Sequence, residues 1–176
     1  MPTLVAAVVL VGVLCLFNLL LIFGVIRRLR EQSGQLTSLL GDRPAAELSV
    51  PIGQQVDDFT ATTTAGAPLS RAWLRTTTLV GFFSADCAPC KQQIPAFIQR
   101  AADFAGPALA VTVGPPDRTA ELVSALDDAA TVLDDGPGGS LAAAFGVRAY
   151  PTILLVGGSG RVQHSAASVA ALPVFA

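Results

Sequence analysis

The longest apolar run of the chain lies near its start. Leu4 to Ile26 contains no charged residue and only Asn18 as a clearly polar one. As a helix this stretch would be about 34 Å long, enough to cross a hydrocarbon core of about 30 Å. The residues before it, Met1 to Thr3, do not form the basic start of a cleaved signal peptide. The pattern predicts an uncleaved single transmembrane anchor at residues 1–28.

A mixed polar and apolar stretch follows the anchor. Leucines recur among polar residues between Leu29 and Leu40, which predicts an amphipathic stalk, although an ordinary linker fits the same pattern. Gly41 and the prolines at 44 and 51 interrupt regular structure. We therefore assign residues 29–50 to a stalk or linker and residues 51–176 to a folded domain.

Within that domain, strand-like and helix-like stretches alternate. A first hairpin is expected within 59–69, turning at Gly66. Further strands are expected at Thr78–Phe83, Ala108–Val113, Ala130–Leu133, Thr152–Val156 and Arg161–His164. Helices are expected at Cys87–Phe97, with an interruption at Pro95, and at Arg118–Leu126 and Ser140–Phe145. Such alternation predicts an α/β fold in which helices cover both faces of a central sheet.

Composition and charge change this picture little. A chain of 176 residues has room for one ordinary domain plus an extension. The hydrophobic content of 52% includes the anchor and still leaves enough apolar residues for a core. The net charge of −2 gives no sign of a nucleic-acid partner, so none is expected.

The strongest chemical motif is Cys87-Ala88-Pro89-Cys90, between a predicted strand and a predicted helix. A free cysteine with a pKa near 8.5 supplies little thiolate at neutral pH, but the unpaired N–H groups and dipole of a helix start favour the anion. Pro89 lacks an N–H and suits a first turn. Cys87 is therefore the predicted nucleophile. Cys90, one turn further, is the predicted resolving cysteine that attacks a mixed disulfide on Cys87.

A CxxC pair has two other known roles. Half of a zinc site is disfavoured, because the other cysteine, Cys15, lies in the predicted anchor and the single histidine is His164. Neither a metal nor a cofactor is expected. A static disulfide in a binding domain stays open as the second role.

The order of motifs resembles thioredoxin, and most closely the membrane-anchored TlpA/ResA group of thioredoxin-like proteins, including the MauD type. Pro51-Ile52-Gly53 with Asp58-Phe59-Thr60 is similar to the entry strand of that group. Cys87 to Lys91 with Pro95 resembles its active-site helix, and Ala144 to Thr152 resembles its "YGVxxxPT" segment.

The resemblance implies a thioredoxin fold with a cis bond between Tyr150 and Pro151 beside the cysteines. The backbone around Tyr150, Pro151 and Thr152 would then pair with an extended substrate. It also implies a disulfide reductase or exchanger outside the cytoplasm, acting on a cysteine-containing protein, with cytochrome c maturation as one setting. The electron donor in the membrane is not identified by the sequence.

Topology evidence conflicts. Arg27, Arg28 and Arg30 follow the anchor, and by the positive-inside rule they would place the domain in the cytoplasm. The family resemblance implies the opposite side. We expect a single-pass protein of the cell membrane with its thioredoxin-like domain outside the cytoplasm.

The chain also departs from that family. Many members carry an acidic residue where this chain has Gln93, and thioredoxin has a buried aspartate where this chain has Gly81. Asp86 stands at a common aromatic position; it is a candidate N-cap whose charge would oppose thiolate formation at Cys87. Pro89, Lys91 and Pro95 are the other neighbours expected to modulate the pair. The segment after residue 165, with Pro173, is short for a closing helix.

Four functions can be compared on these observations. The favoured one is a membrane-tethered thiol–disulfide oxidoreductase, and the alternative is a redox-silent thioredoxin-fold adaptor. A thiol peroxidase of the AhpC/TSA type would need "PxxxTxxC" with proline at position 80, which is Val80. A copper-delivery site of the Sco type would need CxxxC and a histidine, so it is also disfavoured.

Overall fold

The computed structural model describes Gly12 and residues 49–173. The chain divides into two units, residues 1–44 and 45–176, and the second contains the folded domain considered below. The predicted anchor and stalk lie outside the described residues, apart from Gly12, Ser49 and Val50. Among the described residues, no helix has the length and apolar character needed to span a bilayer.

The domain is built on a five-stranded sheet with the order β5-β4-β3-β6-β7. The strands are β3 (Thr78–Ser84), β4 (Ala108–Val113), β5 (Thr131–Asp134), β6 (Thr152–Val156) and β7 (Val162–Ala166). The central strand β3 pairs in parallel with β4 and antiparallel with β6. β3 is buried from Thr78 to Phe83. Apolar residues follow one another along this strand because other parts of the domain pack on both of its faces.

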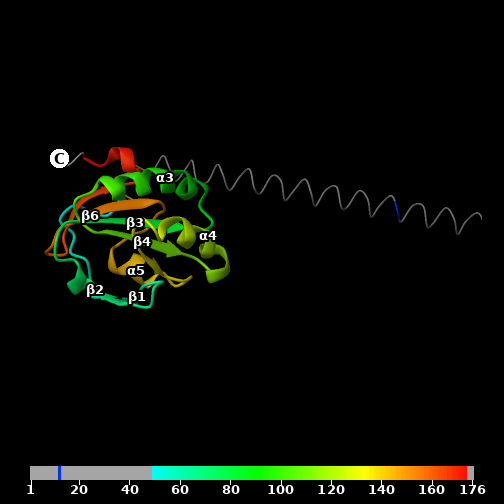
Figure 1. Cartoon of the computed structure of the whole chain (residues 1–176), viewed down its shortest axis with the longest axis horizontal. Helices are drawn as coiled ribbons and strands as arrows, with labels where there is room; N and C mark the ends of the chain where they lie inside the picture. The colour runs from blue at the N-terminus through cyan, green and yellow to red at the C-terminus, as the bar shows by residue number, and fades with distance from the viewer. Residues whose placement is uncertain (1–11, 13–48, 174–176) are drawn as a thin grey trace, which may run out of the picture. The chain divides into compact units, whose positions relative to one another are not determined.

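Two apolar clusters lie on the two faces of this sheet. Leu79 and Phe83 point to one face, where they pack with helices α3 (Ala88–Asp103) and α4 (Pro116–Leu126). Val80 and Phe82 point to the other, where they pack with α5 (Ser140–Ala144) and the N-terminal elements. Figure 1 shows this layering, with α3 on one side of the sheet and α5 on the other. The α/β fold with a mixed sheet and flanking helices is therefore confirmed.

The N-terminal elements form a small separate hairpin and a short helical turn. β1 (Thr60–Thr62) pairs antiparallel with β2 (Pro68–Ser70). Gly66 lies between them with φ +82°, a conformation that glycine adopts without strain. A 3-10 helix, η1 (Arg71–Trp73), follows β2 and leads the chain toward β3. The hairpin expected within residues 59–69 is thus present, shifted by one residue.

The strand predictions agree closely with the structure, and one helix prediction was wrong. β4 and β6 match their predicted bounds, and the other strands of the sheet differ by one or two residues. The helix after the cysteines was expected to be interrupted at Pro95, but α3 continues to Asp103. Pro95 removes one backbone donor, while the buried face formed by Ile94, Phe97 and Ala101 holds the helix on the sheet on both sides of it.

The C-terminal segment closes the domain without a long helix. Between the end of β7 and residue 173, the helical structure is the 3-10 helix η2 (Val169–Ala171). Gln93 of α3 accepts a hydrogen bond from the Val169 N–H at 3.1 Å, and Arg100 donates to the carbonyl of Pro173 at 2.7 Å. Leu172 is buried in the same apolar cluster as α3. Two polar contacts and one apolar side chain thus take the place of the closing helix.

Candidate active site

Cys87 lies where β3 turns into α3. β3 ends at Ser84, residues 85–86 form a turn, and Cys87 adopts an extended conformation with φ −102° and ψ 105°. It is the N-cap of α3, and its sulfur accepts a hydrogen bond from the Cys90 N–H at 3.3 Å. Pro89 stands in the first turn, where its missing N–H leaves no hydrogen bond unmade. The half-buried Cys87 sulfur is thus held at the start of the helix by a backbone donor.

Cys90 has the opposite environment. Its side chain is buried, and its sulfur accepts a long contact of 3.5 Å from the Ser84 N–H. Burial raises the pKa of the Cys90 thiol far above its usual range, and the hydrogen bond with Cys87 raises it further. The two cysteines are free thiols in this structure. One thiol is therefore accessible and the other is kept protonated beneath it.

A loop before β6 forms the other wall of the site. The bond between Tyr150 and Pro151 is cis, as expected. The Cys87 thiol donates a hydrogen bond to the Tyr150 carbonyl at 3.4 Å, so the two segments meet although 63 residues separate them. Thr152 donates to the carbonyl of Ala149 at 2.7 Å and pairs with Phe82 of β3, which fixes the loop against the sheet.

The Tyr150 ring packs against both apolar clusters. Burial raises the pKa of its hydroxyl, and the charge of Asp135 raises it further. Asp135 itself accepts hydrogen bonds at 2.9 Å from the N–H groups of Leu141 and Ala142 in the first turn of α5. The Tyr150 ring is thus neutral and fixed, while its carbonyl faces the cysteine.

The predicted role of Asp86 as N-cap was wrong. Because Cys87 keeps an extended backbone and α3 begins at Ala88, Cys87 takes the cap position and Asp86 lies one residue too early. Asp86 instead forms an ion pair with Arg118 of α4. Lys91 forms a second ion pair with α4, to Glu121 at 3.3 Å. Pro95 lies further along α3 with an exposed side chain.

The two positions where related proteins carry an acid have other surroundings here. A Cβ atom on Gly81 would lie 2.7 Å from the rings of Phe83 and Phe97, which stack edge to face at 5.2 Å. Any side chain at position 81 would therefore clash with the core. Gln93 uses its side-chain oxygen to hold η2, as described above. These two positions serve packing and tethering.

Arg118 is the residue near the site that sequence reasoning missed. It lies 31 positions after Cys87 and belongs to no motif. A usable signal existed, because β4 is parallel to β3, and the helices that follow two parallel neighbours begin at the same edge of the sheet. The charged residues at the start of α4 were therefore candidates for contact with the cysteine loop.

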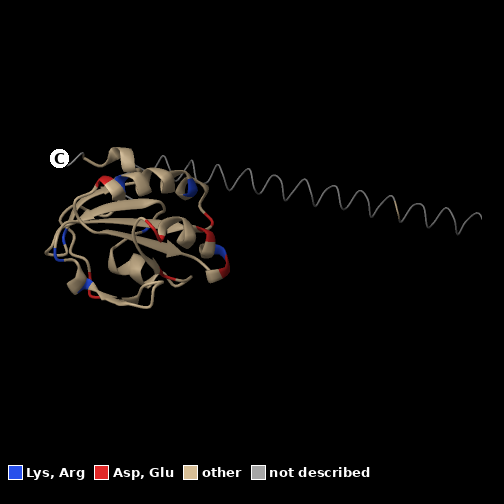
Figure 2. Ribbon diagram, in the orientation of Figure 1, with Lys and Arg blue, Asp and Glu red and all other residues tan. Residues whose placement is uncertain are grey.

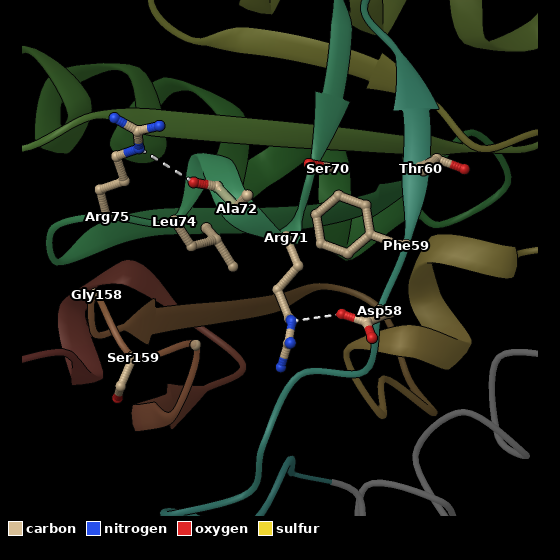
Figure 3. A pocket seen from close by; sticks show the side chains of 11 residues that line it. Asp58, Phe59, Thr60, Ser70, Arg71, Ala72, Leu74, Arg75, Gly158 and Ser159 are labelled. Carbon is tan, nitrogen blue, oxygen red and sulfur yellow. Dashed lines mark hydrogen bonds and ion pairs between the residues drawn. The ribbon is translucent and has the colours of Figure 1, made fainter.

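A pocket of about 490 Å³ lies at the other end of the sheet. Figure 3 shows its lining: Arg71 and Arg75 near η1, Phe59 and Leu74, and the turn that contains Gly158 and Ser159. Arg71 is paired with Asp58 at 2.7 Å. Its walls contain neither cysteine and none of the loop around Tyr150.

Among residues 49–173, no group of three His, Cys, Asp or Glu side chains is close enough to hold a metal ion. The described residues that meet around Cys87 are instead two thiols, backbone carbonyl and N–H groups, and paired surface charges. This is a set of groups suited to thiol exchange.

Comparisons with known proteins agree with this geometry. The model of the AhpC/TSA family matches residues 52–165, which is more than half of the chain. No curated protein sequence matches the chain.

Three solved structures are among those similar to the chain. A secreted Mycobacterium tuberculosis disulfide oxidoreductase homologous to Escherichia coli DsbE is 25% identical, with a TM-score of 0.53, over 63% of this chain and 87% of that one. DsbF from the same organism is 25% identical, with a TM-score of 0.55, over 61% and 82%. The thioredoxin domain of a Bacteroides vulgatus thiol-disulfide oxidoreductase is 16% identical, with a TM-score of 0.57, over 66% and 89%, a likeness of fold alone.

Proposed function

The chain belongs to the AhpC/TSA family and is a thioredoxin-like oxidoreductase, and from this premise we propose that it is a membrane-tethered thiol–disulfide oxidoreductase acting on cysteine-containing proteins outside the cytoplasm. The observation that carries the proposal is the unequal pair of thiols. Cys87 is accessible and lies 3.4 Å from a backbone carbonyl, while Cys90 is buried beside it. An adaptor would not need this arrangement of two free thiols.

In the first step, the Cys87 thiolate attacks one sulfur of a substrate disulfide. A Cys87–substrate S–S bond forms, the substrate S–S bond breaks, and the released substrate sulfur takes up a proton. The Cys90 N–H stabilises the attacking sulfur from the helix start. The backbone at Tyr150, Pro151 and Thr152 is positioned to pair with an extended substrate segment beside the sulfur.

In the second step, Cys90 loses its proton and attacks the Cys87 sulfur of the mixed disulfide. The Cys87–Cys90 bond forms, and the second substrate sulfur leaves and is protonated. The protein has then given two electrons to the substrate, and the Cys90 proton together with one proton from solvent completes the two substrate thiols. Because burial opposes ionisation of Cys90, this thiol stays protonated until the mixed disulfide places a leaving group next to it.

The family name also covers the peroxidase alternative, which the sequence disfavours. A peroxidatic motif would place proline at position 80, but Val80 is a buried residue in the middle of β3. A strand interior with its hydrogen bonds made is a poor place for proline. The geometry thus favours disulfide exchange over peroxide reduction.

A trapping experiment tests the proposal on the full-length chain. In a Cys90→Ala variant the first step proceeds but the second cannot, so the substrate stays attached to Cys87. We expect cysteine proteins of the extracytoplasmic space to be recovered as adducts that thiol reductants release. A Cys87→Ala/Cys90→Ala variant is the control. Equal recovery from both variants would support the redox-silent adaptor instead.

Localisation has its own test. A membrane-impermeant thiol label added to intact cells should modify Cys87 if the domain faces outward. Modification that requires cell lysis would instead show that the arginines after the anchor determine the topology.

A further inference from the structure

Helix α4 contacts both sides of the CxxC motif with charged side chains. Arg118 pairs with Asp86, which directly precedes Cys87, and Glu121 pairs with Lys91, which directly follows Cys90. Arg118 and Glu121 are three residues apart and therefore share one face of the helix. Figure 2 shows acidic and basic positions on α4 and on the loop before α3.

The backbone at the start of α4, which carries Arg118, is held in place by close packing and hydrogen bonds. Gly114 precedes it with φ +148°, and a Cβ atom there would approach the Cβ of Ala85 to 3.3 Å, so the glycine lets α4 begin against the cysteine loop. The buried Thr119 donates to Asp134 of β5 at 3.1 Å. Ala85 donates its N–H to the carbonyl of Val113 at 3.2 Å. The backbones that carry the ion pair are thus fixed on both sides.

We propose that Arg118 is a positioning residue for the nucleophile, because it cancels the negative charge of Asp86 next to the Cys87 sulfur. An unpaired carboxylate one residue from Cys87 would oppose formation of the thiolate. The guanidinium group of Arg118 offsets that opposition through its ion pair with Asp86. The inference deepens the proposed function and rests on the nucleophilic role of Cys87.

The other ionisable groups near Cys87 do not substitute for Arg118. They come from α3, from α4 and from the loop before β6, and they are Cys90, Lys91, Glu121 and Tyr150. Lys91 is held by Glu121, and Cys90 and Tyr150 have raised pKa values that keep them neutral. Among the described residues, Arg118 is the cation that the structure places on Asp86.

The expected effect is modest, because the side chains of Arg118 and Asp86 are 55% and 53% exposed and water screens their charges. A thiolate that forms more readily is also a weaker nucleophile, which offsets part of the gain. We therefore expect a change of about two- to threefold in the rate of Cys87 attack at low salt and neutral pH.

Alkylation of a single thiol measures this effect without any substrate. In the full-length chain with Cys15→Ala and Cys90→Ala, iodoacetamide can react only with Cys87. Adding Arg118→Gln should slow the reaction at neutral pH and move the rate profile to higher pH, and 1 M salt should shrink the difference. Arg118→Lys should retain most of the rate, since it keeps the charge.

A double-variant cycle decides between charge and structure. Arg118→Gln should have little effect once Asp86→Asn is present, because no carboxylate remains to be cancelled. Arg161→Gln, at the far end of the sheet, is the matched control for loss of one positive charge. An unchanged rate in Arg118→Gln, or an equal slowing with and without Asp86→Asn, would overturn the inference. Since alkylation needs no disulfide substrate, this outcome is independent of whether the proposed enzymatic function holds.

Discussion

The two ends of strand β3 differ in the groups that surround them. At its amino end, η1 and the turn at 157–160 surround the pocket of about 490 Å³, lined by arginines, backbone and apolar side chains. At its carboxyl end lie the two thiols and the cis Tyr150–Pro151 loop. This pocket and the reactive atoms are thus at opposite ends. The difference teaches that this pocket does not mark the reactive centre, because disulfide exchange needs one accessible sulfur rather than an enclosed cavity.

Close backbone approach at a glycine serves a different purpose at each end. At the amino end, a Cβ atom on Gly158 would lie 2.2 Å from the Arg75 carbonyl oxygen, so the turn is locked against the chain before β3. At the carboxyl end, Gly114 lets α4 begin beside Ala85. One approach stabilises the fold, and the other brings Arg118 to the cysteine loop.

The largest expected effect contrasts the two ends directly. Cys87→Ser should lower insulin reduction by the full-length chain by about a hundredfold or more, because a serine hydroxyl is not a nucleophile for disulfides at neutral pH. Arg75→Gln, in the pocket at the other end, should leave the rate unchanged. Turbidity of reduced insulin measures both. Comparable activity of Cys87→Ser and wild type would remove the enzymatic interpretation.

A variant at the amino end of β3 should instead lose stability and keep its activity. Gly158→Ala should destabilise the domain by about 1–3 kcal/mol, since the added methyl group meets backbone that cannot move aside. Gly138→Ala is the matched control, because a Cβ atom there has nothing within 4 Å. Thermal unfolding gives the comparison, and insulin reduction per folded molecule should stay at the wild-type level in both. No loss of stability in Gly158→Ala would mean that the amino end is loosely packed.

The same contrast separates what the sequence could predict from what it could not. Strands such as β4 and β6 were located within their true bounds because continuous apolar runs between turn residues have few alternatives. The cysteine pair and the cis-proline loop were found by their motifs.

The predictions were wrong at positions whose structure depends on packing between segments that are distant in the sequence. Local preference predicts Asp86 as the N-cap, but the extended backbone of Cys87 places the start of α3 at Ala88, so Cys87 takes the cap position. Pro95 was expected to interrupt α3, but the buried side chains around it keep the helix in place. Arg118 carries no local signal, since its role depends on where α4 begins in space.

The pH dependence of stability should arise from Cys90 and Tyr150, which lie at the carboxyl end of β3. The pKa of Cys90 is raised in the folded state, so its contribution to stability is present below pH 9 and is lost as pH rises from there toward the raised pKa. The reduced protein should lose up to about 1.4 kcal/mol per pH unit above pH 9 from this group. The raised pKa of Tyr150 adds a loss of the same sign.

Urea unfolding at several pH values measures this dependence. Cys90→Ala should show a shallower decline than the reduced wild type, because the contribution of the Cys90 thiol is then absent. The oxidised protein, which has no thiol at position 90, should resemble the variant. Parallel declines in all three forms would indicate that Cys90 is solvated in the folded state.

The smallest effect concerns the position where relatives often carry an acid. Gln93→Ala should destabilise the domain by about 0.5–1.5 kcal/mol, because the half-buried Val169 N–H loses its acceptor. Gln93→Glu keeps an oxygen acceptor and should be close to neutral.

Neither variant should alter the rate of insulin reduction, because the Gln93 side chain is occupied with η2. The glutamate variant is the informative one: it restores the acidic residue without adding bulk, so it separates the identity of the residue from its location. If Gln93→Glu raised the rate at neutral pH, a carboxylate at this position would be able to accept the Cys90 proton, and the wild-type protein would lack that proton relay. If the rate stays unchanged while Gln93→Ala loses stability, the side chain at position 93 serves to hold η2. Cys90 then gives up its proton without help from this residue.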